Sequence, residues 1–218
     1  MDLIVRNLSE QIFDLVRDRI VSGSVPANLA IRQDALANEL GVSKIPLREA
    51  LARLEQEGLL VSQPNRGFFV RPLTGEEAEE VYALRLKIEP DAVAAAAECA
   101  SDADREYARL ALDSLDRAIE KGTDDVGRLN RAFHLALVGP AHQPLTFQMV
   151  ERLHIMAERY VRKHLEPMGR DTRANEEHEM MLEAWLSGDA RVVAELTRQH
   201  IAATLTDLRK QFNQDEKQ

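Results

Sequence analysis

Two adjacent β-strand patterns are the feature that most limits how this chain can fold. The stretch "LLVSQPNRGFFV" at 59–70 places apolar, β-favouring residues on both sides of a Gln-Pro-Asn-Arg-Gly turn. That arrangement predicts a β-hairpin. Elsewhere, apolar residues recur at helical spacing. We therefore expect a single hairpin in an otherwise helical protein.

Three helices are predicted before the hairpin. Ser9 is expected to cap a first helix that ends at about Val21, and a short second helix fits "QDALANEL" and stops at Gly41. Ser43 is expected to cap the third helix. Pro46 is compatible with that helix because it lies in the first turn, where its missing N–H would have no intrahelical partner. Three helices followed by a hairpin are the arrangement of a winged helix-turn-helix.

The pattern changes after a break around Pro72. Thr74, followed three residues later by Glu77, is a capping box that predicts a new helix. The fold class is therefore mostly α, with a winged helix-turn-helix at 1–72, a linker at 73–75 and an all-helical bundle at 76–218. The helices expected in the bundle are 75–98, 102–121, 123–139, 143–166, 171–187 and 189–212.

Charge divides in the same way. Residues 1–72 contain nine basic and nine acidic side chains, so the remainder carries the whole net charge of −9. A neutral N-terminal part can bind a polyanion if its basic groups gather on one face, whereas the acidic part would be repelled.

No apolar run approaches the roughly 20 residues of a membrane span. The N-terminus lacks the pattern of an export signal, so we expect a cytoplasmic protein. Cys99, inside "AVAAAAECA", is expected to be a buried thiol rather than a nucleophile.

The third helix has two different faces. An inward stripe of Leu47, Ala50, Leu51 and Leu54 is expected to hold it on the first two helices. Basic and small side chains fall off that stripe near the helix start. Such a face suits insertion into a DNA major groove, where Arg can bind a guanine edge. A solvated face bearing i,i+4 ion pairs is the alternative.

The stretch "LANELGVSKIPLREALARLEQEGLLVSQPNRGFFV" closely resembles the N-terminal domain of the GntR family of bacterial transcription regulators, over about residues 8–72. The resemblance implies that Lys44, Ile45 and Arg48 enter the major groove. Ser43 would reach a phosphate, and a wing tip of Asn65, Arg66 and Gly67 would lie near the minor groove. Two positions depart from the family: Lys44 stands where Arg is commoner, and Asp34 replaces a basic residue found in some members. Arg32 is the alternative phosphate contact.

Three histidines of the helical part lie on inward stripes. Asn130 and His134 are four residues apart on one predicted helix, and His178 and His200 each share a face with apolar residues. Buried imidazoles need partners. Three of them with one oxygen donor suit Zn²⁺ or a similar divalent ion. Hydrogen-bonded core histidines are the alternative at this point.

Residues of about 75–212, with "LRLKIEPDAVAAAA", "LNRAFHLAL", "EEHEMMLEAWLSGDA" and "TRQHI", are similar to the helical effector domain of the FadR subfamily, called FCD. The likeness implies a divalent metal, zinc or alternatively nickel or manganese, held by Asn130, His134, His178 and His200. The first position is often Asp in the family, so Asn removes one negative charge. The likeness also implies a small organic acid as effector, bound by the metal. Arg85 would either bind this acid as well or pair with Glu89, its i+4 neighbour.

The other histidines match no ligand position. His142 is expected in a loop, and His154 and His164 at the surface. These inferences together predict a homodimeric transcription regulator that acts as a repressor and is not an enzyme. It would bind double-stranded operator DNA and a small carboxylate. One alternative is a regulator with no metal and a hydrophobic or acyl effector. The other, a metal hydrolase using the three histidines, lacks a convincing general base.

Overall fold

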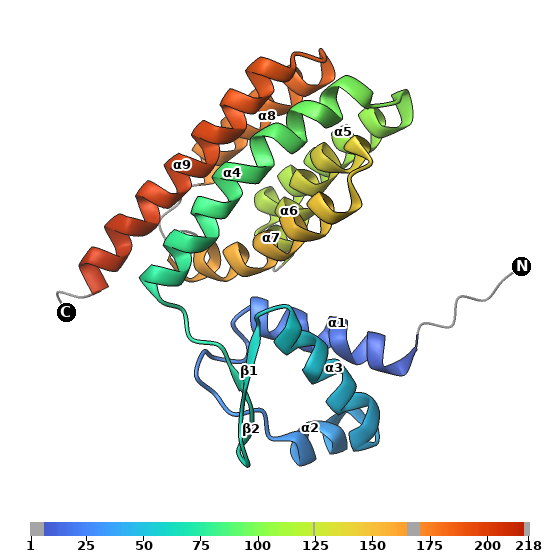
Figure 1. The fold of residues 1–218 in the computed structure, drawn as a ribbon, viewed down its shortest axis with the longest axis vertical. Coiled ribbons are helices and arrows are strands. Elements are labelled where there is room, and N and C mark those ends of the chain that lie inside the picture. The colour runs from blue at the N-terminus through green and yellow to red at the C-terminus, as the bar shows by residue number, and fades with distance from the viewer. Residues whose placement is uncertain (1–6, 124, 165–170, 216–218) are drawn as a thin grey trace, which may run out of the picture. The chain divides into compact units, whose positions relative to one another are not determined.

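The computed structural model of this chain describes residues 7–123, 125–164 and 171–215. They belong to two compact units, Met1–Leu73 and Thr74–Gln218, each described by itself (Figure 1). Part of the predicted linker is helical, because Thr74 caps, and Gly75 begins, the first helix of the second unit. Three predictions fall on residues outside this range. They are the end of helix 143–166, the surface position of the His164 side chain, and the first six residues of the N-terminus, where no export signal is expected.

The first unit consists of three helices followed by an antiparallel hairpin, as the sequence predicts. Its elements are α1 (Leu8–Val21), α2 (Gln33–Leu40), α3 (Lys44–Gln56), β1 (Leu60–Gln63) and β2 (Gly67–Val70). The predicted inward stripe of α3, Leu47, Ala50, Leu51 and Leu54, is completely buried. It packs mainly against α1. The interior of the unit therefore fixes which face of α3 points outward.

Two backbone details set the position of α3 and the hairpin. Gly41 ends α2 in the left-handed region at φ +64°, which suits a residue without a side chain and lets α3 start three residues later. The segment before α2 lies along β2: Ile31 N donates to Phe68 O at 2.8 Å, and Val70 N donates to Leu29 O at 2.9 Å. The hairpin is thus tied to the start of α2.

One predicted cap in this unit is wrong. The N-cap of α1 is Asn7, whose side-chain oxygen accepts from the backbone N–H of Ser9. Ser9 lies within the helix and is buried. The capping chemistry has the predicted kind but begins two residues earlier, because Asn is as good a cap as Ser and Leu8 continues the helix.

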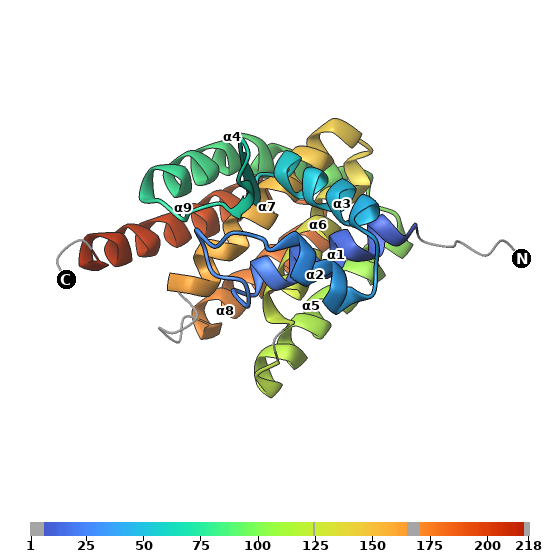
Figure 2. The same cartoon turned by 90° about the horizontal axis from the view of Figure 1, so that it is seen from below.

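The second unit is an all-helical bundle, also as predicted. Its elements are α4 (Gly75–Cys99), α5 (Asp102–Lys121), α6 (Val126–Val138), the short 3₁₀ helix η1 (Gly139–Ala141), α7 (Pro144–His164), α8 (Asp171–Leu186) and α9 (Ala190–Asp215). Helices α4 and α9 pack side by side along much of their length (Figure 1 and Figure 2). The 3₁₀ turn was not predicted, and α6 begins three residues later than expected.

The interior of the bundle is apolar and dense. Phe133 and Leu137 of α6 and Met181 and Trp185 of α8 are fully or almost fully buried. The indole N–H of Trp185 donates to the carbonyl of Leu137 at 3.0 Å, so its polar atom is satisfied. This cluster fixes α6 and α8 against each other next to the predicted metal ligands.

The cysteine is not where the sequence placed it. Cys99 is exposed at the end of α4, because the buried face of the helix ends two residues earlier with Ala96 and Ala97. Among the described helices, none is long and apolar enough to cross a bilayer.

Candidate metal centre and nucleic-acid interface

The start of α3 presents the side chains expected to meet DNA. Ile45 is 72% exposed although it is apolar, and Lys44 and Arg48 are also exposed. Ser43 is the N-cap residue of α3, but in the part of the chain that the structure describes its hydroxyl makes no capping hydrogen bond. The outward face of α3 therefore carries two cations and one large apolar group, with the Ser43 hydroxyl exposed at the helix end.

A groove connects this face of α3 with the hairpin. Six of the eight residues predicted to contact DNA line it, namely Arg32, Lys44, Arg48, Asn65, Arg66 and Gly67. Ser43 and Ile45 do not line it but lie next to Lys44 at the exposed end of α3. Gln33, Ser62 and Gln63 also line the groove, and the sequence analysis did not include them. A concave surface rich in basic and amide groups is what phosphate and base contacts require.

Asp34 lies inside this otherwise basic groove. Its Oδ1 is 2.5 Å from Nζ of Lys44, and both side chains are mostly exposed. The two residues that depart from the family pattern, Asp34 and Lys44, therefore form an ion pair with each other. This pair places one acceptor and one strong donor next to each other on the surface that would read base edges.

The tip of the hairpin has the geometry of a tight turn. Asn65 has a positive φ of +60° and Gly67 one of +84°, conformations that favour these two residue types. The guanidinium of Arg66 lies over the ring of Phe69, 5.1 Å from its centre. This stacking holds a cation at the edge of the hairpin.

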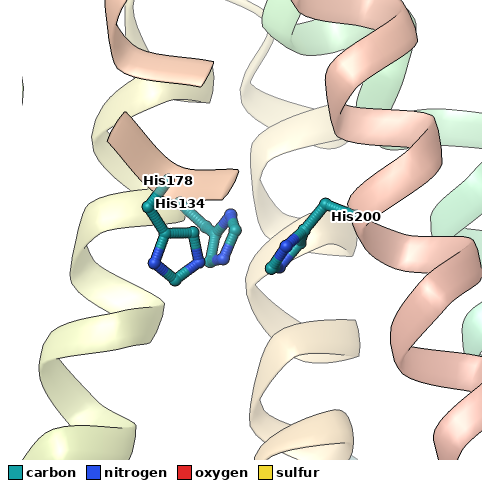
Figure 3. A group of neighbouring side chains, drawn as sticks. All are labelled: His134, His178 and His200. Carbon is teal, nitrogen blue, oxygen red and sulfur yellow. The ribbon is translucent and has the colours of Figure 1, made fainter. Parts of the chain in front are cut away.

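Three histidines from three helices meet inside the second unit. His134 of α6, His178 of α8 and His200 of α9 are all buried, and one nitrogen from each lies within 4.8 Å of the others (Figure 3). The sequence placed each on an inward stripe, and the packing of the bundle brings the three stripes together. Such a group of imidazoles is a suitable half-formed ligand set for a divalent transition metal.

Glu177 supports this cluster from behind. Its Oε2 lies 2.7 Å from Nδ1 of His200. Because a carboxylate accepts, Nδ1 is the donor, and in a neutral imidazole this tautomer leaves the lone pair on Nε2 for a metal. A carboxylate behind a histidine is the usual outer support of a metal ligand. Glu177 immediately precedes His178 on α8, and no pattern in the sequence singled it out.

The protonation state of His134 also suits a metal ligand. Burial lowers the pKa of His134 well below its usual value, and the positive charge that the neighbouring histidines and Arg85 can carry lowers it further. Its imidazole is therefore neutral near pH 7, the form that donates a lone pair to a metal.

Asn130, the predicted oxygen ligand, lies one turn before His134 on α6. It is half-buried and lines the same cavity as the three histidines. The donor set at this end of the cavity is thus three imidazoles and one amide. Those donors fit a divalent ion such as Zn²⁺, with the difference that Asn130, unlike an aspartate, brings no negative charge.

The cavity next to the histidines has a volume of about 90 Å³. Its walls combine the histidine cluster with apolar groups from α5, α6 and α7 and with three charged side chains. The apolar lining residues include Leu115, Ile119, Val126, Ala157 and Val161, and the charged ones are Arg85, Arg131 and Glu158. A small polar molecule with an aliphatic body matches such a lining.

Arg85 forms the pair with Glu89 that was one of its two predicted roles, and its binding to an effector stays a prediction. It lines the cavity, and its guanidinium forms a two-point ion pair with Glu89 at 2.6 and 3.1 Å, with both side chains buried. His154 joins this pair, with Nε2 at 3.1 Å from Glu89 and 3.3 Å from Arg85. Burial alone would raise the pKa of Glu89, but Arg85 and then His154 lower it to about 2.

The assignment of His154 to the surface is wrong. Its side chain is 3% exposed, and its ring centre lies 4.9 Å from that of His134. A signal was present in the sequence, because Val150, Leu153 and Ala157 place an inward stripe on α7 that includes position 154. His142 lies in a turn and is exposed, as expected.

A second buried ion pair closes the other side of the cavity. Arg131 of α6 pairs with Glu158 of α7, and both side chains are about 10% exposed. Gly127, one turn earlier on α6, allows this approach: a Cβ there would lie 2.5 Å from Oε1 of Glu158. Neither residue of this pair was singled out from the sequence.

Comparison with known proteins decides the family. Residues 8–70 match the family described as "Bacterial regulatory proteins, gntR family", and residues 80–203 match the FCD domain. The chain belongs to the GntR family of bacterial transcription regulators. Its second unit is an FCD domain, as its sequence motifs implied.

The relatives of this GntR-family chain are regulators rather than enzymes, which argues against the metal-hydrolase alternative. The transcriptional regulator YdhC of Bacillus subtilis is 30% identical over 146 residues, which are 66% of this chain and 65%, just under two thirds, of that protein. The putative L-lactate dehydrogenase operon regulatory protein of Escherichia coli is 25% identical, over 99% of this chain and 92% of that one. The structure of Escherichia coli McbR/YncC has the same fold, with a TM-score of 0.83, 24% identity and coverage of 94% and 99%.

Proposed function

We propose that this regulator binds operator DNA through its first unit and releases it when a small carboxylate binds beside a divalent metal in its FCD domain. It would act in the cytoplasm as a homodimeric repressor. The observation that carries the proposal is the cluster of His134, His178 and His200 at the wall of a cavity inside the bundle. A metal bound there would supply a Lewis-acidic cation for a carboxylate oxygen.

The DNA-binding part rests on the exposed end of α3 and the groove beside it. Arg48 and Lys44 supply donors for guanine edges, and Ile45 supplies an apolar contact for a thymine methyl. Arg66 and Arg32, at the hairpin and the start of α2, suit phosphate contacts. In a homodimer, two copies of α3 would enter major grooves about one helical turn apart, so a small reorientation would change affinity strongly.

The effector part rests on the lining of the cavity. Its cationic and imidazole groups suit a carboxylate, and its volume suits a small one. One relative is named for an L-lactate dehydrogenase operon, which makes small organic acids the first candidates. The alternative is a regulator with no metal and a hydrophobic effector, which would use the apolar wall.

Metal analysis of the gently purified protein tests the metal site. We expect about one zinc, nickel or manganese ion per chain, as structural affinities for such ligand sets predict. The variant His178→Ala should lose it, and the control His142→Ala, in an exposed turn, should keep it. Less than about 0.2 metal per chain in the wild type would refute the metal site and favour the hydrophobic alternative.

DNA selection from a random pool tests the other half. The wild type should enrich a two-fold symmetric sequence, and adding a panel of small carboxylates with metal should release it. Enrichment of no sequence at all would contradict operator binding. Retention of DNA with every carboxylate, in a protein that carries metal, would contradict the proposed effector class alone.

A further inference from the structure

The charges around the FCD cavity balance one another before any ligand is present. Arg85 is neutralised by Glu89 and Arg131 by Glu158, in buried pairs. Glu177, behind His200, pairs with Arg173, which also pairs with Asp207. Lys210 completes that row beside Asp207. Each anion near the histidines therefore already has a cation of its own.

A divalent ion on the histidine cluster would disturb this balance. Imidazoles bind metals in their neutral form, and Asn130 offers an uncharged amide oxygen at the wall of the same cavity. The bound ion would bring two positive charges to four ligands that include no acidic side chain, and the one acidic residue in the described lining of the cavity, Glu158, already pairs with Arg131. Burying an uncompensated charge is strongly unfavourable. Two negative charges must come from elsewhere.

We infer that the effector of this regulator is a small dicarboxylate, and that the metal and this dianion bind interdependently. The inference rests on the proposed metal site and names the class of effector that the site requires. One carboxylate lies at the metal and cancels the charge that an acidic ligand at position 130 would have cancelled. The second carboxylate cancels the remaining charge from within the cavity.

Asn175 provides a position for the second carboxylate. It lines the cavity from α8, and its buried Oδ1 has no hydrogen-bond partner among the described atoms. Rotating the amide by half a turn exchanges its oxygen and nitrogen and presents the NH₂ donors to the cavity. A carboxylate accepts from those donors, so a dianion satisfies a group that is otherwise buried without a partner.

The effect of an acid on the affinity for zinc tests whether metal and dianion bind interdependently. Zinc binding is titrated by calorimetry on the metal-free full chain, alone and with succinate or butyrate, which have the same carbon skeleton and differ in one carboxylate. We expect succinate to raise zinc affinity at least about tenfold more than butyrate does, within the usual range of coupling between two sites. By linkage, zinc raises succinate affinity by the same factor.

The variant Asn130→Asp supplies the missing charge. Zinc alone should then bind at least about tenfold tighter, and the advantage of succinate over butyrate should fall to about threefold or less. Gln148→Glu adds the same charge to an exposed position of α7 and should leave both quantities unchanged. Asn175→Ala should weaken succinate, but not butyrate, which tests the second carboxylate position even if Asn130→Asp fails to fold.

Equal coupling of zinc to succinate and butyrate in the wild type would overturn the inference. So would an Asn130→Asp variant that folds and keeps the full preference for succinate. Failure of the metal site itself has a different signature: the wild type and His134→Ala would bind zinc equally poorly in the presence of either acid. The two failures are therefore distinguishable in one set of titrations.

Discussion

Two ion pairs of nearly equal length have opposite surroundings in the two units. Lys44 and Asp34 of the first unit are 2.5 Å apart with side chains 63% and 75% exposed. Arg85 and Glu89 of the second are 2.6 Å apart with side chains 6% and 2% exposed. Water screens the first pair, so its charges remain available to a partner such as DNA. The second pair has no such screening, and each member depends on the other.

The largest expected effect comes from breaking the buried pair. Glu89→Gln leaves the Arg85 guanidinium buried without a counter-charge, which should lower the free energy of unfolding by about 3–5 kcal/mol. Urea denaturation followed by circular dichroism measures this. Glu79→Gln is the matched control on the same helix, because Glu79 pairs with Arg209 at 2.5 Å but in an exposed position. It should cost about 0–1 kcal/mol. Equal losses would show that burial does not separate the two kinds of pair.

Removing an outward cation of α3 should affect DNA and leave stability almost unchanged. Arg48→Ala is expected to cost about 1–3 kcal/mol of specific binding to a selected operator, through loss of a base contact. Gel-shift titration at fixed salt measures it, with zinc binding and thermal unfolding as controls. Ala is also tested at Arg53, whose guanidinium lies over the ring of Phe13, 4.3 Å from its centre. Comparable loss of specificity in both variants would contradict the assignment of Arg48.

His134, in the second unit, should make the stability of the metal-free protein depend on pH. The lowered pKa of His134 means that the unfolded chain binds this proton more readily than the folded chain. Its contribution is thus complete above the ordinary histidine pKa of about 6.5 and is lost, by about 1.4 kcal/mol per pH unit, as pH falls below it. Denaturation of metal-free protein at pH 7.5 and 5.5 tests this. His134→Gln should flatten the slope, whereas His142→Gln, at an exposed turn, should not.

The smallest change in stability is expected at the exposed pair. Asp34→Asn should change the free energy of unfolding by less than about 1 kcal/mol. Because it removes an anion from the DNA-facing groove, general affinity for DNA should rise and its salt dependence should steepen. Binding isotherms at several salt concentrations measure both. If affinity falls instead, Asp34 itself contacts a base, for example the amino group of a cytosine.

Periodicity along the chain was sufficient for the fold and for the faces of the helices. The stripe of Leu47 and Leu51, and the inward positions of His134, His178 and His200, follow from spacing alone and agree with the structure. Spacing reports which face of a helix is buried. The left-handed turn at Gly41 was equally accessible, because glycine marks helix ends by a local rule.

Pairing between distant helices was not accessible in the same way. His154 meets Glu89 across 65 residues and Arg131 meets Glu158 across 27, and neither spacing nor composition indicates which charges will share a cavity. Cys99 was misplaced for a related reason: it follows a run of alanines, yet the buried face of α4 ends at Ala97. Local patterns predict which face of a helix is buried. Which side chains pair inside the bundle depends on how the buried faces of different helices pack together.

The position of Trp185 gives the protein an optical probe of one unit only. It is the single tryptophan of the chain, lies two turns after His178 on α8, and donates to Leu137, three residues after His134 on α6. Its emission therefore reports the surroundings of the two helices that bear three of the four proposed ligands. Titrations of metal and of acids can be followed by fluorescence without a label, while the DNA-binding unit remains dark at the same excitation wavelength.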